Sequence, residues 1–77
     1  MGILKGDCKM KTVKGKKYKV NFDPRGFFKP GDIVVALEDD RIPVCVLEKD
    51  YVPRFKNAIH YSASQRNAIK AIYLEEV

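Results

Sequence analysis

Lysines in the first third of the chain are the residues best suited to chemistry. Residues 1–30 contain nine lysines and arginines against two aspartates, a net charge of +7, whereas residues 31–77 contain six against eight, a net charge of −2. On an extended strand, lysines at alternate positions share one face, where they can contact phosphates of a nucleic acid or carboxylates of an acidic protein. The alternative interpretation is that they keep an exposed strand soluble and unpaired. The candidate residues are Lys9, Lys11, Lys14, Lys16, Lys17 and Lys19.

Three aromatic residues lie close to these lysines in the sequence. Tyr18 stands between two of the lysines, and Phe27 and Phe28 follow within ten residues. Aromatic rings beside a basic face can stack on bases or contact a partner protein. The same rings can also pack in the core of a small domain, and the sequence leaves both interpretations open.

Residues that commonly perform catalysis or bind metals are few and scattered. His60 is the only histidine, and no sequence pattern pairs it with Cys8 or Cys45 as a nucleophile. The cysteines form no CxxC or Cys/His cluster, and the acidic residues 38–40 lack the spacing of a calcium-binding loop. We therefore predict no catalytic residue, no metal site and no cofactor, and we predict that Cys45 is a small buried side chain.

Length and composition indicate one domain spanning residues 1–77, with 45% hydrophobic residues. No apolar run approaches the roughly 18 to 20 residues that cross a membrane. The first residues lack the pattern of a secretory signal or a myristoylation site. The expectation is a cytoplasmic domain without a membrane contact.

The clearest structural signal is a pair of apolar runs on either side of the acidic residues 38–40. Residues 33–37 and 42–47 alternate with period two, and both runs are apolar on both faces. A four-residue loop, 38–41, would put Leu37 beside Ile42 and Val35 beside Val44, with Pro43 at a site that needs no N–H donor. Strands buried on both sides in so short a chain predict a small closed barrel.

Weaker patterns predict the remaining elements. Residues 8–13 and 17–22 alternate around a turn at 14–16, which predicts a second hairpin carrying the lysines. Residues 21–31 predict an ordered loop that contains a turn at 23–26, with Phe27 and Phe28 tucked beneath it. A short strand is expected at 55–61. For the last segment we prefer a strand at 68–72 followed by a turn at 74–76, and the alternative is a helix capped by Ser64.

The order of these features resembles the SH3-like small barrels. The likeness rests on a basic first hairpin, a long Pro/Gly loop, the stretch KPGDIVVAL entering a strand, a charged turn, and the closing AIYLEEV. It implies an all-β fold of five to six antiparallel strands with a short C-terminal 3₁₀ or α-helical turn. The chain has no Trp for docking proline-rich peptides and lacks the Gly-spaced motif of ribosomal KOW barrels.

Taken together, these patterns predict a non-enzymatic binding module. The first hypothesis is association with nucleic acid through the basic hairpin, largely without sequence specificity. The second is a protein–protein adaptor that presents the aromatic 21–31 loop or a barrel edge to its partner.

Overall fold

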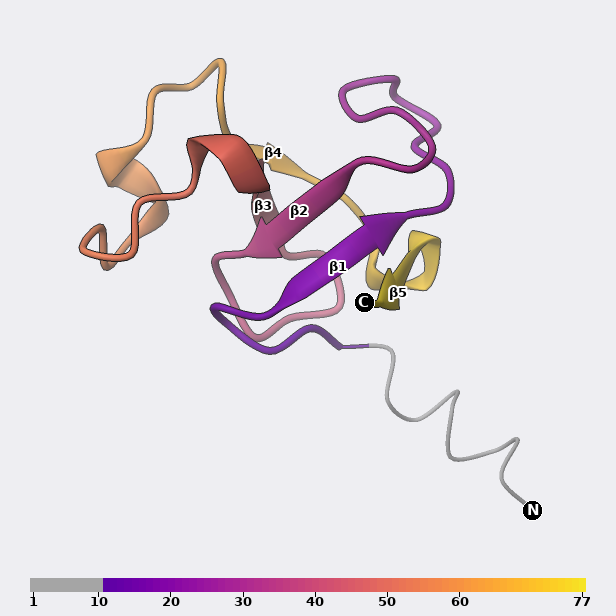
Figure 1. The fold of residues 1–77 in the computed structure, drawn as a ribbon, viewed down its shortest axis with the longest axis horizontal. Helices are drawn as coiled ribbons and strands as arrows, with labels where there is room; N and C mark the ends of the chain where they lie inside the picture. Colours follow the sequence, from indigo (N-terminus) through magenta and orange to yellow (C-terminus); the bar gives the residue numbers. More distant parts are fainter. Residues whose placement is uncertain (1–10) are drawn as a thin grey trace.

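The computed structural model describes residues 11–77, which form one antiparallel sheet of five strands (Figure 1). The strands run in the spatial order β4-β3-β2-β1-β5, and three 3₁₀ turns lie between them. Among these residues, no helix is long and apolar enough to cross a membrane. The bounds are β1 Lys17–Val20, β2 Ile33–Ala36, β3 Val44–Leu47, η1 Glu48–Asp50, η2 Ala58–His60, β4 Asn67–Ala68, η3 Ala71–Tyr73 and β5 Leu74–Glu76.

The central hairpin of β2 and β3 is present, but its register differs from the predicted one by two residues. Val35 lies opposite Val46, and the Leu37 N–H donates to the carbonyl of Val44, so the loop is 38–43 rather than 38–41. This register is compatible with Pro43, which has no N–H to donate, because Pro43 lies outside the ladder of β2 and β3. Its carbonyl accepts a hydrogen bond from the Ile69 N–H. A shift of two residues leaves each side chain on its predicted face.

Both faces of this hairpin are buried, as the doubly apolar runs predicted. On one face the main core gathers side chains from β1, β2, β3 and β5 and from two connecting segments: Tyr18, Val20, Phe28, Val34, Ala36, Cys45, Ile69 and Leu74. On the other face Leu37 and Val46 pack against Tyr61. The segment between β3 and β4 supplies this second cover, and it extends to one end of the molecule in Figure 1, away from the loop between β1 and β2.

The predicted first hairpin is wrong in its described part. Residues 11–13 form no strand, and β1 pairs instead with β2 and β5, while residues 8–10 lie outside the described residues. The turn is confirmed, since the Lys16 N–H donates to the Val13 carbonyl and Gly15 has a φ of 86°, which suits the third position of a type II turn. Residues 12–15 cross over the 38–43 loop, where Thr12 donates its hydroxyl to the Glu38 carbonyl at 2.7 Å.

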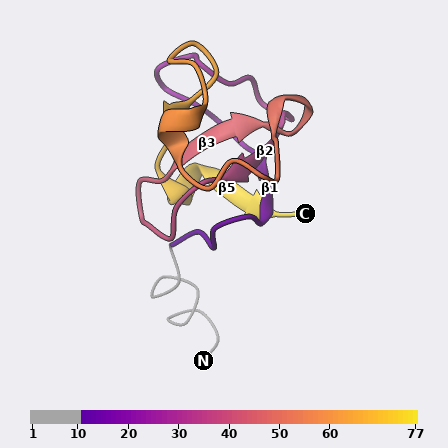
Figure 2. The ribbon, with the colours of Figure 1, turned by 90° about the vertical axis from the view of Figure 1, so that its left-hand side faces the viewer.

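The sheet stays open, so the predicted closed barrel is wrong, although the all-β class with antiparallel strands is confirmed. Figure 2 shows β5 lying beside β1. At the opposite edge of the sheet, β4 is the last strand and pairs with β3. Residues 55–61 form no strand, because the Tyr61 hydroxyl bonds to both backbone groups of Val52 and folds the segment back on itself.

The last segment also differs from the preferred prediction. A strand of two residues, β4, precedes the 3₁₀ turn η3, and residues 74–76 are the strand β5 rather than a turn. The alternative helix capped by Ser64 is absent from the described chain. The pairing of β5 with β1 explains the difference, since Leu74 lies opposite Val20 and is buried.

Candidate functional site

We use the term lysine stripe for Lys11, Lys14, Lys16, Lys17 and Lys19, and all five are exposed. Lys17 and Lys19 project from the outer side of β1, because the alternate residues Tyr18 and Val20 point into the core. Lys14 lies in the turn that precedes the strand. Lys9, the sixth predicted residue, lies outside the described residues. The predicted grouping of lysines therefore occurs around β1, but on a strand with neighbours on both sides.

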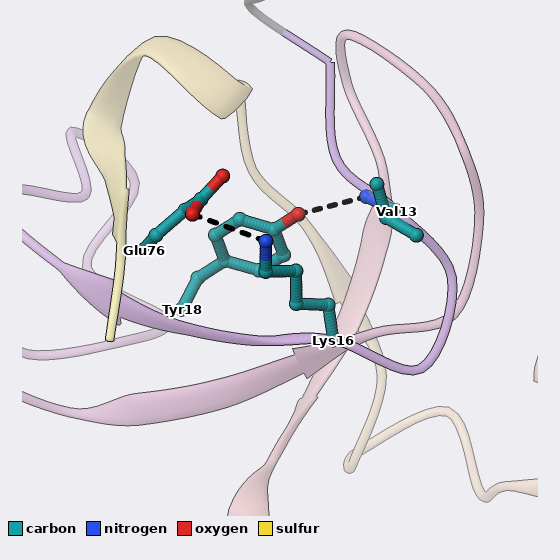
Figure 3. A network of polar contacts seen from close by, with 4 residues as sticks. All are labelled: Val13, Lys16, Tyr18 and Glu76. Carbon is teal, nitrogen blue, oxygen red and sulfur yellow. Dashed lines mark hydrogen bonds and ion pairs between the residues drawn. The ribbon is translucent and has the colours of Figure 1, made fainter.

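Glutamates compensate much of this charge. The Lys16 ammonium lies 3.0 Å from the Glu76 carboxylate (Figure 3), that of Lys17 2.7 Å from Glu48, and that of Lys19 3.9 Å from Glu75. These side chains are all partly exposed, so each pair contributes at most about 1 kcal/mol to stability. A phosphate could displace the glutamates at little cost, but it would meet a stripe that is already partly neutralised.

Two of the three predicted stacking residues lie in the core. Tyr18 is 5% exposed and its hydroxyl accepts a hydrogen bond from the Val13 N–H at 2.8 Å (Figure 3). Phe28 is 3% exposed, whereas Phe27 is 55% exposed. Tyr18 and Phe28 are therefore core residues. Of the three aromatic residues, only Phe27 is exposed enough for a partner to contact.

The loop 21–31 is held in shape by the buried carboxylate of Asp23. One of its oxygens accepts from the Arg25 N–H at 3.0 Å and the other from the Phe28 N–H at 2.9 Å. The Gly26 N–H donates to the Asp23 carbonyl, which confirms the predicted turn at 23–26. At the base of the loop, the Gly31 N–H donates to the Val20 carbonyl at 2.7 Å. These bonds make the loop an ordered wall.

This wall borders a pocket of about 160 Å³, which we call the loop pocket. Three segments that are distant in sequence meet there: the 23–25 turn, the end of the 38–43 loop, and the chain from β4 to η3. Backbone bonds hold the last two together, from the Ile69 N–H to the Pro43 carbonyl and from the Ala71 N–H to the Arg41 carbonyl at 2.7 Å. The lining residues are Asp23, Pro24, Arg25, Ile42, Ala68, Ile69, Lys70 and Tyr73.

The surface beside the pocket is apolar. Phe22 contacts Tyr73 edge to face with a centroid distance of 5.8 Å, and Phe22 is 54% exposed. Ile42, on the pocket lining, is 52% exposed. Bulky side chains held open to water around a hollow are typical of a surface that another molecule covers.

Three charged residues line the pocket, two cations and one carboxylate, which gives the lining a net charge of +1. Arg25 and Lys70 are exposed, and no ion pair within residues 11–77 involves either of them. The third charged lining residue, Asp23, uses both carboxylate oxygens for backbone N–H groups of its own loop. The pocket therefore combines a mainly apolar lining with two cations that form no ion pair within residues 11–77.

The histidine and the described cysteine, two side-chain types that often take part in catalysis, make structural contacts here. His60 is exposed and packs edge to face on Phe55 at 5.6 Å. Cys45 is buried as predicted, and burial, with a smaller contribution from Glu38, raises the pKa of its thiol to about 12. The described chain contains no group of three or more His, Cys, Asp or Glu residues that could hold a metal ion.

Sequence reasoning missed most of the loop pocket. It identified the 23–26 turn, but not that Ile42, Lys70 and Tyr73 would meet it. The local sequence signal for the pocket was weak. A lysine within an apolar stretch, such as Lys70, is equally typical of an exposed position on a strand. The three segments meet through long-range backbone bonds, between residues 41–43 and 69–71 and from the Asn21 N–H to the Tyr73 carbonyl.

Comparison with known proteins adds no relative. No family model, no curated protein and no solved structure matches the chain.

Proposed function

We propose that this chain is a non-enzymatic binding module that engages a partner protein through the loop pocket. The observation that carries the proposal is the pocket itself, an ordered hollow with an apolar lining and exposed Phe22 and Ile42 beside it. Covering such surface is favourable by roughly 25 cal/mol for each Å² of apolar area removed from water. This corresponds to the adaptor hypothesis, with the 21–31 loop as one wall of the site.

Two observations favour this function over nucleic-acid binding. Three of the five described lysines of the lysine stripe are paired with glutamates. The rings of Tyr18 and Phe28 are buried and cannot reach a base. Stacking supplies much of the affinity in single-strand binding, and cations that are already paired gain less from a phosphate.

Peptide selection on the full 77-residue chain tests the proposal. Ile42→Ser changes an exposed lining residue, and Ile59→Ser is the matched control, because Ile59 is 74% exposed in η2 and does not line the pocket. We expect peptides displayed on phage to be enriched by the wild-type chain, and to lose binding to the Ile42 variant but not to the Ile59 variant. Absence of enrichment, or equal binding to all three chains, would contradict a protein-binding pocket.

Nucleic-acid binding through the lysine stripe is a second candidate, favoured by the exposure of all five described lysines. Contact with about four phosphates would give log K against log salt a slope near −3 to −4, a loss of about 25- to 80-fold between 50 and 150 mM salt. Anisotropy titrations of labelled oligonucleotides measure this slope. Replacing Lys9, Lys11, Lys17 and Lys19 with Gln should flatten it, and an unaltered slope would exclude these four lysines as the binding surface.

The proposal keeps two further predictions. The first is the resemblance to SH3-like domains, supported by the five antiparallel strands and by the 3₁₀ turn η3 before the last strand. The second is the cytoplasmic location, which stays a prediction from the sequence.

A further inference from the structure

The size of the loop pocket matches one bulky side chain. Its volume of about 160 Å³ is close to that of an engineered protein cavity of about 150 Å³ that holds benzene. Pro24, Ile42 and Ile69 line it, and the ring of Tyr73 adds a further apolar surface. The hollow therefore suits a phenyl ring or a large aliphatic side chain.

The charges that line the pocket determine which residues of a ligand are favoured next to the inserted side chain. Arg25 and Lys70 stand on the lining without an ion-pair partner among residues 11–77, and the Asp23 carboxylate is occupied by two backbone N–H groups. By contrast, Glu48, Glu75 and Glu76 are engaged with the lysine stripe. A ligand at the pocket thus meets two available cations and no available carboxylate among the lining residues.

Resting on the proposed function above, we infer that the partner presents an acidic peptide segment that inserts one aromatic or large aliphatic side chain into the loop pocket. Carboxylates on either side of the inserted residue contact the Arg25 guanidinium, which can hold a carboxylate with two parallel hydrogen bonds, and the Lys70 ammonium. A nucleotide would also bring negative charge, but a base needs polar partners for its edges, and the lining offers mainly hydrocarbon.

The test uses the full ¹⁵N-labelled chain and four fluorescein-labelled probes at low salt. Three of the probes are peptides. The acidic Phe peptide has a phenylalanine flanked by Asp and Glu, the basic Phe peptide has the same phenylalanine flanked by lysines, and the Gly peptide is the acidic one with Gly in place of Phe. The fourth is a short oligothymidine. We expect the acidic Phe peptide to bind about fivefold more tightly than the basic one, the gain expected from two exposed ion pairs. It should also shift the amide signals of Arg25, Ile69 and Tyr73, and the Gly peptide should not.

Charge variants locate the preference. Arg25→Gln with Lys70→Gln should abolish the preference for the acidic peptide and leave the fold intact, because both side chains are exposed. Arg54→Gln with Lys56→Gln is the matched control, which removes one arginine and one lysine that do not line the pocket. This control variant should retain the preference.

The outcomes separate the two proposals. If acidic and basic Phe peptides bind equally at the pocket, the acidic partner is overturned and the protein-binding module stands. If the pocket amides respond to oligothymidine and to none of the peptides, both proposals are overturned in favour of nucleic acid. If the pocket amides respond to none of the probes, both are overturned as well.

Discussion

Replacing Asp23 with Asn should destabilise the protein far more than an isosteric change of one atom normally does. Both carboxylate oxygens accept backbone N–H groups, from Arg25 at 3.0 Å and from Phe28 at 2.9 Å, and Asp23 is only 6% exposed. An amide keeps one acceptor and turns an NH₂ group toward the other N–H. One charge-assisted bond is lost, one becomes neutral, and a donor is left unpaired, which together cost about 2–4 kcal/mol.

This cost is large against the total of about 4–12 kcal/mol expected for a domain of this length. It should lower the melting temperature by about 8–30 °C, using about 4–8 °C for each kcal/mol. Urea denaturation followed by circular dichroism measures the free energy of unfolding directly. Asp32→Asn, in the residue that follows the loop, is the control, since its carboxylate accepts one exposed bond, from the Lys29 N–H at 2.8 Å, and should cost less than about 1 kcal/mol. If the Asp23 variant loses no more than the Asp32 variant, the loop is not held by the carboxylate.

Three further substitutions have defined outcomes. Val35→Asp should prevent folding, because Val35 is 0% exposed and the new carboxylate would be buried. The control Val13→Asp, at a 55% exposed site, should keep a cooperative thermal transition. Such a transition in both variants would refute the buried hairpin. Gly15→Ala should cost about 1–2 kcal/mol in urea unfolding because of its φ of 86°, and an unchanged midpoint would show that the turn is not strained by a Cβ. The Cys45 thiol, with its pKa raised to about 12, stays neutral in the folded chain while the unfolded thiol ionises above about pH 8.5, so stability is lost as pH rises through this window. Wild type should lose about 2 kcal/mol more than Cys45→Ala between pH 8 and pH 10 in urea unfolding, and equal losses would place the thiol in water.

The sequence predicted elements where the signal is local. Residues 33–36 and 44–47 are strands because both runs are β-branched and apolar on both faces. The turn at 23–26 follows from Asp23 and Pro24, which set the conformation within four residues. These parts needed no knowledge of the rest of the chain.

The failures involve partners that lie far away in the sequence. Alternation at 17–20 predicts a strand but not its neighbours, and β5 is one of them, with Tyr18 opposite Glu76. The register of the central hairpin depends on Thr12, which bonds to the Glu38 carbonyl, and on Ile69, which bonds to Pro43. The loop pocket combines three segments of this kind. A single sequence carries no record of such pairings, so the site was found only in the structure.

The position of β5 has a consequence for the order in which the sheet assembles. Closing β1 onto β2 spans the residues between Val20 and Ile33, whereas closing β1 onto β5 spans those between Val20 and Leu74. In a flexible chain the longer closure costs about 1.3 kcal/mol more entropy, from a dependence of (3/2)RT ln n on loop length. A strand of three residues gains few hydrogen bonds in return. We therefore expect β5 to dock last during folding, and its amides to exchange with solvent through partial openings that leave β2 and β3 protected.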